Sequence, residues 1–504
     1  MAKKELQIIK PPLTAYMEEA YPLSIALGEP SRWEWLYSNY IQLMYQNPDI
    51  FMDQPLKFYK LSLNSGYVWD ADCPVLVYDR LSRDMISFFG KDIISIVCFA
   101  INSGKYPVVY LDEYYLPYRG QYHKVHYIHE SLFYGYDDEK KLLYGLAYVT
   151  KEDEYTFKEF DVSFSDVREA YNGLKYDDEM RNRVMFLSNE KERIYRFDID
   201  AVTVCLEEYI NEYPSEKRYA ELSNTNIGRD YKYGGGVYEP FIEYIKRRRI
   251  TSNVIPFQVL VEHKSLMHSR YRFMVENRYI KNEDAVEDGL KKLEKDAVIL
   301  KMCFLKYRAG MNREMLKNII DRLCNIKNEE KEVLKCFLTL TKNGYENGNL
   351  LYSQNAKWGE IERVLGTLSA KNIRVSFKLH IISEKTMGYI VFSSREKMKD
   401  YCDVAKLVIK APNNRFMLDS EEGETEIPNI VCGIGEYDVL VDIDLTKGLY
   451  SCIIISERDE RGYLKCMIKR EHARLFPIDR VSFIHDHSYR YAVSELRTEG
   501  KNDP

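Results

Sequence analysis

The sequence predicts a multidomain α+β protein with an α+β domain at residues 1–160, a mainly helical domain at 161–343 and an antiparallel β-sandwich at 344–495. Three observations lead to this prediction. The chain has 504 residues, which exceeds what one hydrophobic core usually organises. Apolar residues recur at helical spacing from about residue 198 to 341. Beyond this segment the apolar period switches to two, which is typical of strands.

The first domain begins with segments that have the pattern of helices. A first helix is expected at residues 14–27, with Thr14 as its N-terminal cap. A second is expected at 31–46, where Ser and Glu make a capping box. A third is expected at 81–103, broken near Gly90.

Residues 106–148 are expected to form the centre of this domain, as strand, loop, strand, turn and strand. An apolar run at 108–111 ends in two acidic residues, and a loop containing Pro and Gly leads to the second strand. Residues 137–140 are expected to form a hairpin turn, because Asp and Glu beside Lys between two β-rich runs is turn chemistry. The chemically interesting side chains of this stretch are Asp112, Glu113, His123, His126 and His129.

The order of these features resembles the N-terminal domain of the butirosin biosynthesis protein H family. That family is found in antibiotic and nonribosomal-peptide gene clusters, and its domain is related to papain-like, bacteriocin-processing cysteine peptidases. The resemblance covers roughly residues 10–175 and implies a papain-like α+β fold for the first domain. It rests on Asp112, Tyr115, Leu116, Pro117, Tyr122, His126, His129, Tyr134, Gly135, Tyr136 and Asp137.

The resemblance also implies acyl-transfer chemistry. In active relatives a Cys at the start of the first long helix is the nucleophile, and a His at the start of the strand before the hairpin is the base. An acidic or amide residue after the hairpin orients that His. In the butirosin protein this machinery moves an acyl group from a carrier-protein thioester to an amine. Here His129 matches the base position, but residues 14–27 contain no Cys and Leu146-Ala147 occupy the orienting position.

Three interpretations of this departure remain open. The domain is a catalytically inactive binding module, or a thiol elsewhere, Cys73 or Cys98, serves with His129. Alternatively His129 acts as a base without covalent catalysis, because a thioester already carries an activated leaving group. Asp112 is the candidate orienting carboxylate, although a solvated strand end is the simpler interpretation of the acidic pair. The candidate substrate contacts are Tyr115, Tyr122, His126, Tyr134 and Tyr136.

We expect neither a metal nor a cofactor. On a helix the three histidines would suit zinc, but on a strand a spacing of three alternates faces, so the rings do not converge. The glycine run at 234–236 lacks the Lys-Ser/Thr of a phosphate-binding loop and is interpreted as a flexible helix start.

The rest of the chain is expected to hold helices and then strands. Residues 258–279 and 283–308 have the apolar spacing of an antiparallel helical hairpin, and 312–341 add further helix. A boundary is expected near 342–344. The sandwich beyond it resembles carbohydrate-binding modules in pattern, and docking of a partner protein is an equal alternative. Its expected strands are 375–382, 388–394, 405–411, 437–445, 450–457, 463–470 and 480–485, with an unstructured tail at 499–504.

Composition narrows the function classes. The net charge of -6 does not favour general binding to nucleic acid or anionic membranes. Tyr outnumbers Phe by 42 to 21, which suits ligand recognition but also follows from codon preference in a low-GC genome. None of the ten Cys lies in a Cys-x-x-Cys pair, and the chain shows no signal peptide and no run of about twenty apolar residues. We therefore expect a cytoplasmic protein with reduced thiols.

The resemblance to the butirosin biosynthesis protein H family implies an accessory protein of peptide or antibiotic biosynthesis. It would act on, or bind, an acyl or peptidyl group on a carrier protein, or bind another biosynthetic enzyme. The alternatives are a catalytically inactive papain-like scaffold and, more weakly, a carbohydrate-binding protein.

Overall fold

A computed structural model describes most of the chain. The residues outside the description are 1–2, 31, 47–54, 60–72, 152–153, 176–180, 190–196, 216, 218–230, 249–252, 278, 311, 344–359, 365–371, 382–383, 385, 397–399, 470–477, 486–490 and 502–504. The boundary expected near residues 342–344 falls partly in these segments, as do the runs 57–63 and 194–197, whose sequences also have the pattern of strands. In the part that is described, no helix is long and apolar enough to cross a membrane.

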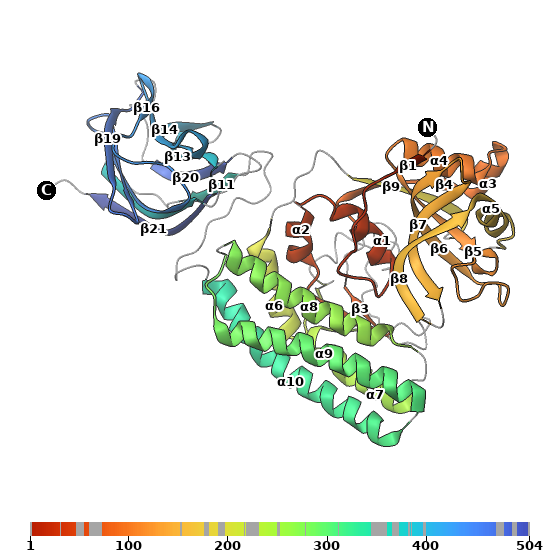
Figure 1. The fold of residues 1–504 in the computed structure, drawn as a ribbon. Coiled ribbons are helices and arrows are strands. Elements are labelled where there is room, and N and C mark those ends of the chain that lie inside the picture. Colours follow the sequence, from red (N-terminus) through yellow and green to blue (C-terminus); the bar gives the residue numbers. More distant parts are fainter. Residues whose placement is uncertain are drawn as a thin grey trace. The chain divides into compact units, whose positions relative to one another are not determined.

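The chain divides into two compact units that do not follow the predicted boundaries. The first unit contains Met1–Tyr195, Val204–His268 and Asp288–Val333. The second contains Arg196–Thr203, Ser269–Glu287 and Leu334–Pro504. The chain is therefore a mixed α and β protein, with a sheet-rich N-terminal part, a helical part and C-terminal sheets (Figure 1).

A mainly antiparallel sheet organises the first unit. Its described strands run in the order β4-β9-β5-β6-β7-β8. In addition, β1 pairs with the C-terminal end of β6, at residues 135–137. The turn predicted at 137–140 joins β6 to β7, and Asp137 stabilises it by accepting backbone N–H groups of Glu139 and Lys140. The strands are β1 (Lys3–Glu5), β4 (Leu76–Ser82), β5 (Tyr106–Asp112), β6 (Ile128–Asp137), β7 (Leu142–Lys151), β8 (Glu154–Ser163) and β9 (Arg183–Asn189).

Three helices share an apolar core with this sheet. The helix expected at 81–103 is two helices, α3 (Arg83–Phe88) and α4 (Ile93–Asn102), separated at Gly90. Gly90 has φ of 61°, a left-handed conformation that ends α3. Helix α5 (Phe164–Asn172) is capped by Ser163, whose Oγ accepts the Asp166 N–H. Buried side chains of the three helices, such as Ile86, Val97 and Val167, pack with those of the sheet.

The N-terminal helix starts later than predicted. Helix α1 (Met17–Ala26) begins after Tyr16, and Pro22 lies inside it. Thr14 does not cap it; its backbone N–H and Oγ1 instead donate to Glu262 in a later helix. The helix expected at 31–46 is also shorter. It is α2 (Arg32–Asn39), and the chain then enters a small sheet of β10 (Lys232–Tyr233), β2 (Leu43–Tyr45) and β3 (Leu56–Phe58).

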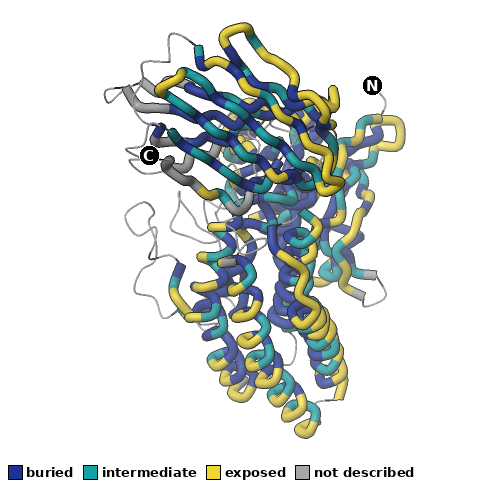
Figure 2. The backbone as a smooth tube through the Cα atoms, turned by 90° about the vertical axis from the view of Figure 1, so that its left-hand side faces the viewer, coloured by how far each residue is buried: buried dark blue, intermediate teal, exposed yellow. Residues whose placement is uncertain are grey.

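The helical part contains three long helices. Their first-unit segments run side by side, since Lys301 bonds Gln258 and Lys292 bonds Glu329. Glu330 is buried among them and accepts hydrogen bonds from Tyr209, Tyr238 and Lys264. Figure 2 shows a buried stripe along one side of these helices and an exposed stripe along the other. The elements are α6 (Ile199–Ile210), η4 (Gly234–Val237), α7 (Tyr238–Arg248), α8 (Ile255–Glu276), α9 (Asp284–Gly310) and α10 (Arg313–Asn343).

Two antiparallel sheets with a common core form most of the second unit. One has the order β11-β20-β13-β14-β15-β16 and the other β19-β18-β17-β12-β21. Alternate residues of both sheets, such as Phe377, Phe392 and Val439, fill the core between them, as in a β-sandwich. The strands are β11 (Glu360–Val364), β12 (Asn372–Ile381), β13 (Met387–Glu396), β14 (Asp400–Lys410), β15 (Arg415–Ser420), β16 (Gly423–Glu426), β17 (Gly435–Asp444), β18 (Leu449–Ser456), β19 (Arg461–Met467), β20 (Ile478–His485) and β21 (Tyr491–Lys501).

Two predicted limits fall inside strands. Residue 160 lies within β8, and β9 lies between β4 and β5, so the first sheet extends past the expected end of its domain. The tail expected to be unstructured from residue 499 begins inside β21, which pairs with β12 up to Lys501.

Candidate active site around His129

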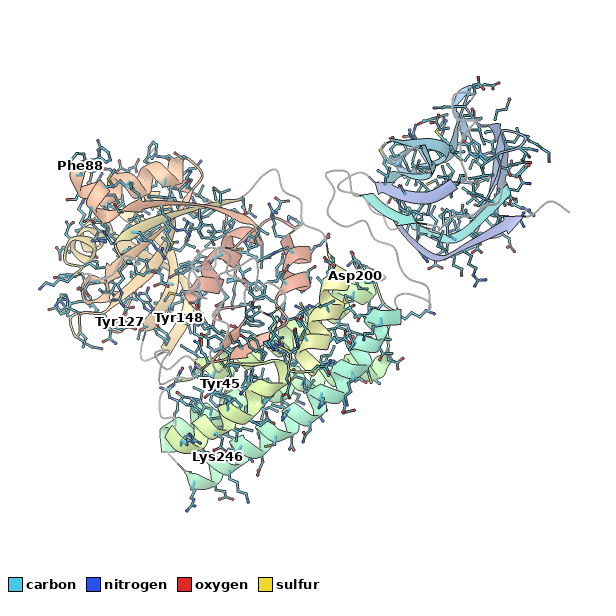
Figure 3. The ribbon with its side chains drawn as sticks, turned by 180° about the vertical axis from the view of Figure 1, so that it is seen from behind. Tyr45, Phe88, Tyr127, Tyr148, Asp200 and Lys246 are labelled. Carbon is cyan, nitrogen blue, oxygen red and sulfur yellow. The ribbon has the colours of Figure 1, made fainter. Side chains whose placement is uncertain are left out.

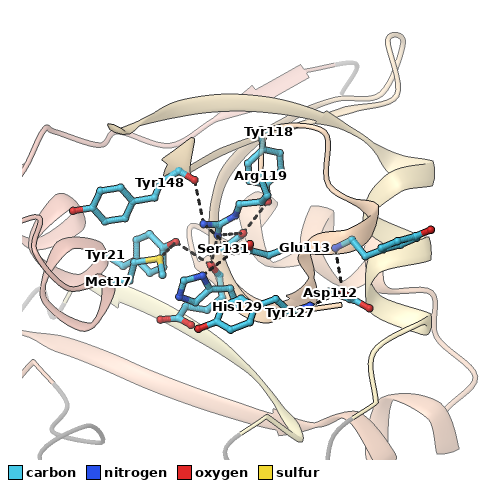
Figure 4. Close-up of polar contacts among 12 residues, drawn as sticks. Met17, Tyr21, Asp112, Glu113, Tyr118, Arg119, Tyr127, His129, Ser131 and Tyr148 are labelled. Atoms are coloured by element: carbon cyan, nitrogen blue, oxygen red, sulfur yellow. Dashed lines mark hydrogen bonds and ion pairs between the residues drawn. The ribbon is translucent and has the colours of Figure 1, made fainter. Parts of the chain in front are cut away.

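The register of β5 and β6 brings the acidic pair close to the histidines. Asp112 is paired with Ile128, and Leu111 with His129. After β5 the chain turns through the short helix η2 (Glu113–Tyr115), and a loop returns it to the start of β6. The backbone N–H of Glu113 donates to the Tyr127 carbonyl, which closes this loop at its base. Figure 4 shows the resulting cluster at this end of the sheet.

His129 is hydrogen-bonded to Glu113. Its Nδ1 lies 2.8 Å from Glu113 Oε1. The Glu113 side chain is 7% exposed, whereas the His129 side chain is 25% exposed. Among the described residues Glu113 is the hydrogen-bonding partner of His129, so Nε2 remains available to a ligand. The base of a catalytic triad has the same arrangement, a histidine ring oriented by a buried carboxylate.

Arg119 forms an ion pair with the carboxylate of Glu113. Its fully buried guanidinium lies 3.5 Å from Glu113 Oε1. It also donates to the carbonyls of Tyr148 at 3.1 Å and Glu130 at 2.8 Å. These carbonyls belong to β7 and β6 beyond the point where the two strands stop pairing, so Arg119 replaces the missing ladder contacts. Burial lowers the pKa of Arg119, but Tyr118, Tyr21 and Glu113 outweigh it and raise the pKa above its usual value.

Asp112 does not have the orienting role that the sequence suggested. Its Oδ2 lies 2.6 Å from His126 Nδ1, and its Oδ1 accepts the backbone N–H groups of Tyr114 and Tyr127. The two histidines therefore bond separate carboxylates, with the adjacent Glu113 serving His129. The reason is that β5 ends at Asp112, and η2 turns Glu113 toward β6.

Met17 is the first residue of α1. The Tyr21 hydroxyl lies 2.9 Å from Met17 Sδ and 3.1 Å from the carbonyl of Glu130, the neighbour of His129. Within the described ranges no Cys, Ser or Thr side chain is hydrogen-bonded to His129. A thioether has no proton to lose, so Met17 cannot replace the thiolate.

The two candidate thiols lie elsewhere. Cys73 is buried just before β4, and strands β9 and β5 separate β4 from β6. Cys98 lies on α4 and interacts with Asp138, at the opposite end of β6 from His129. At about 3.3 Å per residue, these two ends of β6 are roughly 30 Å apart. Burial raises the pKa of Cys98 to about 11, so its thiol stays protonated near neutral pH. No described contact joins either thiol to His129.

The predicted substrate contacts are only partly near the site. Tyr134 and Tyr136 are buried further along β6, where they bond Glu159 and Asn102. Tyr115 packs between Tyr114 and Gly173, and is half-buried. Tyr122 is 37% exposed and lies in the loop before β6, as does His126. Tyr122 and His126, which lie in the loop, therefore remain candidate substrate contacts. Tyr134 and Tyr136 are part of the packed sheet.

Two exposed tyrosines at the site were missed by the sequence reasoning. Tyr127 is 53% exposed and packs its ring edge on His129 at 5.4 Å. Tyr155, at the start of β8, is 54% exposed and stacks on Tyr148 at 4.6 Å. Figure 3 labels Tyr127 and Tyr148 at the end of the sheet where β6 begins and β7 ends. Tyr127 could have been predicted from the sequence, because it lies two residues before His129. Tyr155 could not, because only the pairing of β8 with β7 brings it to the site.

The histidine triplet does not form a metal site. His126 and His129 bond different carboxylates, and the His123 ring packs against Tyr114 and Tyr122. Across the described chain, no group of three or more His, Cys, Asp or Glu side chains is arranged to hold a metal ion.

Comparison with known proteins gives no family. No protein-family model matches the chain, and no curated protein sequence does. Among solved structures, a galectin of Caenorhabditis elegans is 12% identical, with 29% of this chain and 96% of that chain covered and a TM-score of 0.20. The CBM2 module of a Lactobacillus casei phage J-1 evolved Dit protein is 11% identical, with coverages of 28% and 68% and a TM-score of 0.21. Peanut lectin is 14% identical, with coverages of 25% and 73% and a TM-score of 0.18. Scores this low support no conclusion about fold or function.

Proposed function

We propose that the first unit has a papain-like site that acts on an acyl or peptidyl thioester of a carrier protein in peptide or antibiotic biosynthesis. The carrier and the thioester come from the resemblance to the butirosin biosynthesis protein H family. The role of His129 is supported by one observation, its hydrogen bond to the buried Glu113. A buried ion pair often adds little stability, because desolvation of the two charges offsets their attraction; a role in positioning Glu113 beside His129 is therefore the explanation that we favour for the Glu113–Arg119 pair.

In this proposal His129 is a general base and the acceptor amine is the nucleophile. The amine nitrogen attacks the thioester carbonyl while His129 Nε2 takes its proton. The carbon–sulfur bond then breaks, and the imidazolium returns the proton to the departing carrier thiolate. Glu113 keeps Nδ1 protonated and stabilises the imidazolium. A thiolate is a good leaving group, so positioning and proton transfer suffice without an acyl-enzyme.

The exposed tyrosines give the substrate a surface next to the base. Tyr127 and Tyr155 present large amphipathic rings beside His129 and Tyr148. Such rings bury apolar area while their hydroxyls hydrogen-bond, which suits an acyl or peptidyl chain.

A second candidate is binding without catalysis. It is favoured by Met17, which stands where relatives have the nucleophile. In that case the same surface would hold the carrier-bound chain for a partner enzyme.

The test measures loss of the acyl group from a glycyl-loaded carrier protein by intact mass, with a panel of primary amines as acceptors. We expect His129→Ala to slow transfer by about 10²-fold or more, the usual contribution of a general base. His268→Ala on α8 is the matched control, since its Nδ1 likewise lies 2.8 Å from a carboxylate, that of Glu294, and the proposal gives it no role. Equal rates for wild type and His129→Ala would refute the base. Tight carrier binding without transfer in all three proteins would support the binding candidate.

A further inference from the structure

The outer face of one sandwich sheet contains a cavity of about 280 Å³. The sheet is β19-β18-β17-β12-β21, and its inward side chains, such as Phe377, Val439 and Ile454, belong to the core. Because side chains alternate along a strand, their neighbours point outward. The cavity is thus lined by the outward residues of all five strands.

These residues form two adjacent rows across the sheet. The strand register aligns Arg461, Ile455, Asp438 and Lys378 in the first row. It aligns Ile453, Leu440, Ser376 and Arg497 in the second row, with the exposed Tyr463 of β19 next to Ile453. We call these two rows the outer groove.

The outer groove is cationic at both edges and aliphatic in its floor. Arg461 lies on β19 and Arg497 on β21, both are exposed, and neither has an ion-pair partner among the described residues. The floor between them is made of half-buried Leu440, Ile453 and Ile455. Asp438 is the one acidic residue of the lining, and Lys378 stands directly opposite it. Those two charges offset each other, so the two arginines give the groove its net charge.

We infer that the outer groove binds an extended acidic peptide segment with aliphatic side chains. The two arginines are four strand spacings apart, roughly 19 Å at about 4.8 Å per strand. An extended peptide rises about 3.3 Å per residue, so about six residues span this distance. Carboxylates at its two ends would meet the guanidiniums, which bind carboxylates in a bidentate manner. The aliphatic floor and the two edge arginines suit a peptide that carries carboxylates better than they suit a neutral sugar. This site is independent of the function proposed for His129.

The test uses the full chain and a fluorescein-labelled peptide of sequence Glu-Leu-Ser-Leu-Ser-Glu, with fluorescence anisotropy as the readout. We expect saturable binding that weakens as salt rises from 50 to 300 mM and is lost when both Glu are replaced by Gln. The double variant Arg461→Gln/Arg497→Gln is expected to bind at least tenfold more weakly. Asp438→Asn is expected to bind more tightly, because it removes the one carboxylate that repels the peptide.

Arg415→Gln is the matched control, since Arg415 is an exposed arginine on the other sheet, paired with Glu426. It is expected to bind the peptide as wild type does. Thermal unfolding of each variant checks that the sandwich is intact, and the exposed positions of both groove arginines make folding failure unexpected. Absence of saturable binding, or equal affinity in the double variant, would overturn the inference. Binding of a neutral oligosaccharide such as cellohexaose, unaffected by the arginine changes, would replace it with a sugar site.

Discussion

At the scale of single residues, Arg119 determines whether the candidate site keeps its geometry. Its guanidinium joins Glu113 to the carbonyls of Glu130 and Tyr148. Arg119→Leu would remove the buried cation that faces the Glu113 carboxylate and the guanidinium donors to the Glu130 and Tyr148 carbonyls. We predict a loss of about 3 kcal/mol or more in the free energy of unfolding, measured by urea denaturation. Arg168→Leu removes an exposed pair with Asp92 and should cost no more than about 1 kcal/mol. Equal losses in the two variants would contradict the importance given to Arg119.

The reactivity of Cys98 is a second residue-scale prediction. Burial raises the pKa of its thiol to about 11, whereas Cys324 and Cys336 are exposed. Since the thiolate is the reactive form, iodoacetamide at pH 7.5 should label the exposed pair first, as read by peptide mass spectrometry. Labelling of Cys98 should rise about tenfold per pH unit toward pH 10. Fast labelling of Cys98 at neutral pH would restore it as a candidate nucleophile.

At the scale of elements, Glu262 of α8 fixes the approach to α1. Its buried carboxylate accepts the backbone N–H groups of Thr14 and Ala15, and Tyr148 donates to the Thr14 carbonyl. Burial raises the pKa of Glu262 above 4.5, although its hydrogen bonds oppose the shift. A raised carboxyl pKa contributes stability that is present below the unfolded-state value and is lost as pH rises.

We therefore predict how the stability difference between wild type and Glu262→Gln changes with pH, since the glutamine side chain does not titrate. The free energy of unfolding of wild type minus that of the variant should fall as pH rises from about 4.5 to 7. Glu243→Gln serves as the control of opposite sign, because a hydrogen bond from Lys246 lowers the pKa of Glu243. Its difference should rise slightly with pH. A difference that grows with pH for Glu262 would show that its hydrogen bonds outweigh burial.

The start of α7 provides a matched pair of glycine substitutions. Gly234 has φ of 55°, and a Cβ there would lie 2.2 Å from the Tyr209 carbonyl oxygen. Gly235 has no such conformation, and its nearest neighbour would be 3.8 Å away. We predict that Gly234→Ala lowers the free energy of unfolding by about 2 kcal/mol or more, and that Gly235→Ala changes it little. A similar thermal shift in both variants would contradict this.

The sequence predicted which helices and turns form better than it predicted the residues at which the helices begin and end. The hairpin at 137–140, the break at Gly90 and the helical spacing of α9 were all found, since each depends on local chemistry. The length of α2 and the cap of α1 were wrong. Both are set by tertiary contacts, in the latter case by Glu262, which lies about 250 positions away in the chain.

The sequence identified part of the cluster around His129, but it also named Cys73, Tyr134 and Tyr136, which do not lie beside His129. His129 and the neighbouring acidic pair were identified, but the choice of Asp112 over Glu113 was wrong, because η2 rotates the chain at the end of β5. Arg119 and Tyr155 had no local signal. Arg119 reaches the site from the loop before β6, and Tyr155 reaches it through the pairing of β8 with β7.

At the scale of the whole molecule, helices and strands were correctly assigned to the right parts of the chain. Their grouping was not, because β9 returns to the first sheet and the long helices belong to both compact units. Hydrophobic periodicity identifies which faces are buried but not which distant segment covers them. The outer groove is a case in point, because it arises from the register of five strands that no local pattern specifies.

The central claim is that His129 acts as a base without a protein nucleophile. The most direct test is a single-turnover reaction in which the masses of the carrier protein and of this chain are both measured. Acyl-loaded carrier, an amine and excess protein are mixed, quenched at intervals and examined by intact mass spectrometry. We predict that the acyl group leaves the carrier, appears on the amine, is never found on this chain, and stays on the carrier with His129→Ala. An acyl adduct on this chain, or transfer that does not need His129, would contradict a base that works without a protein nucleophile.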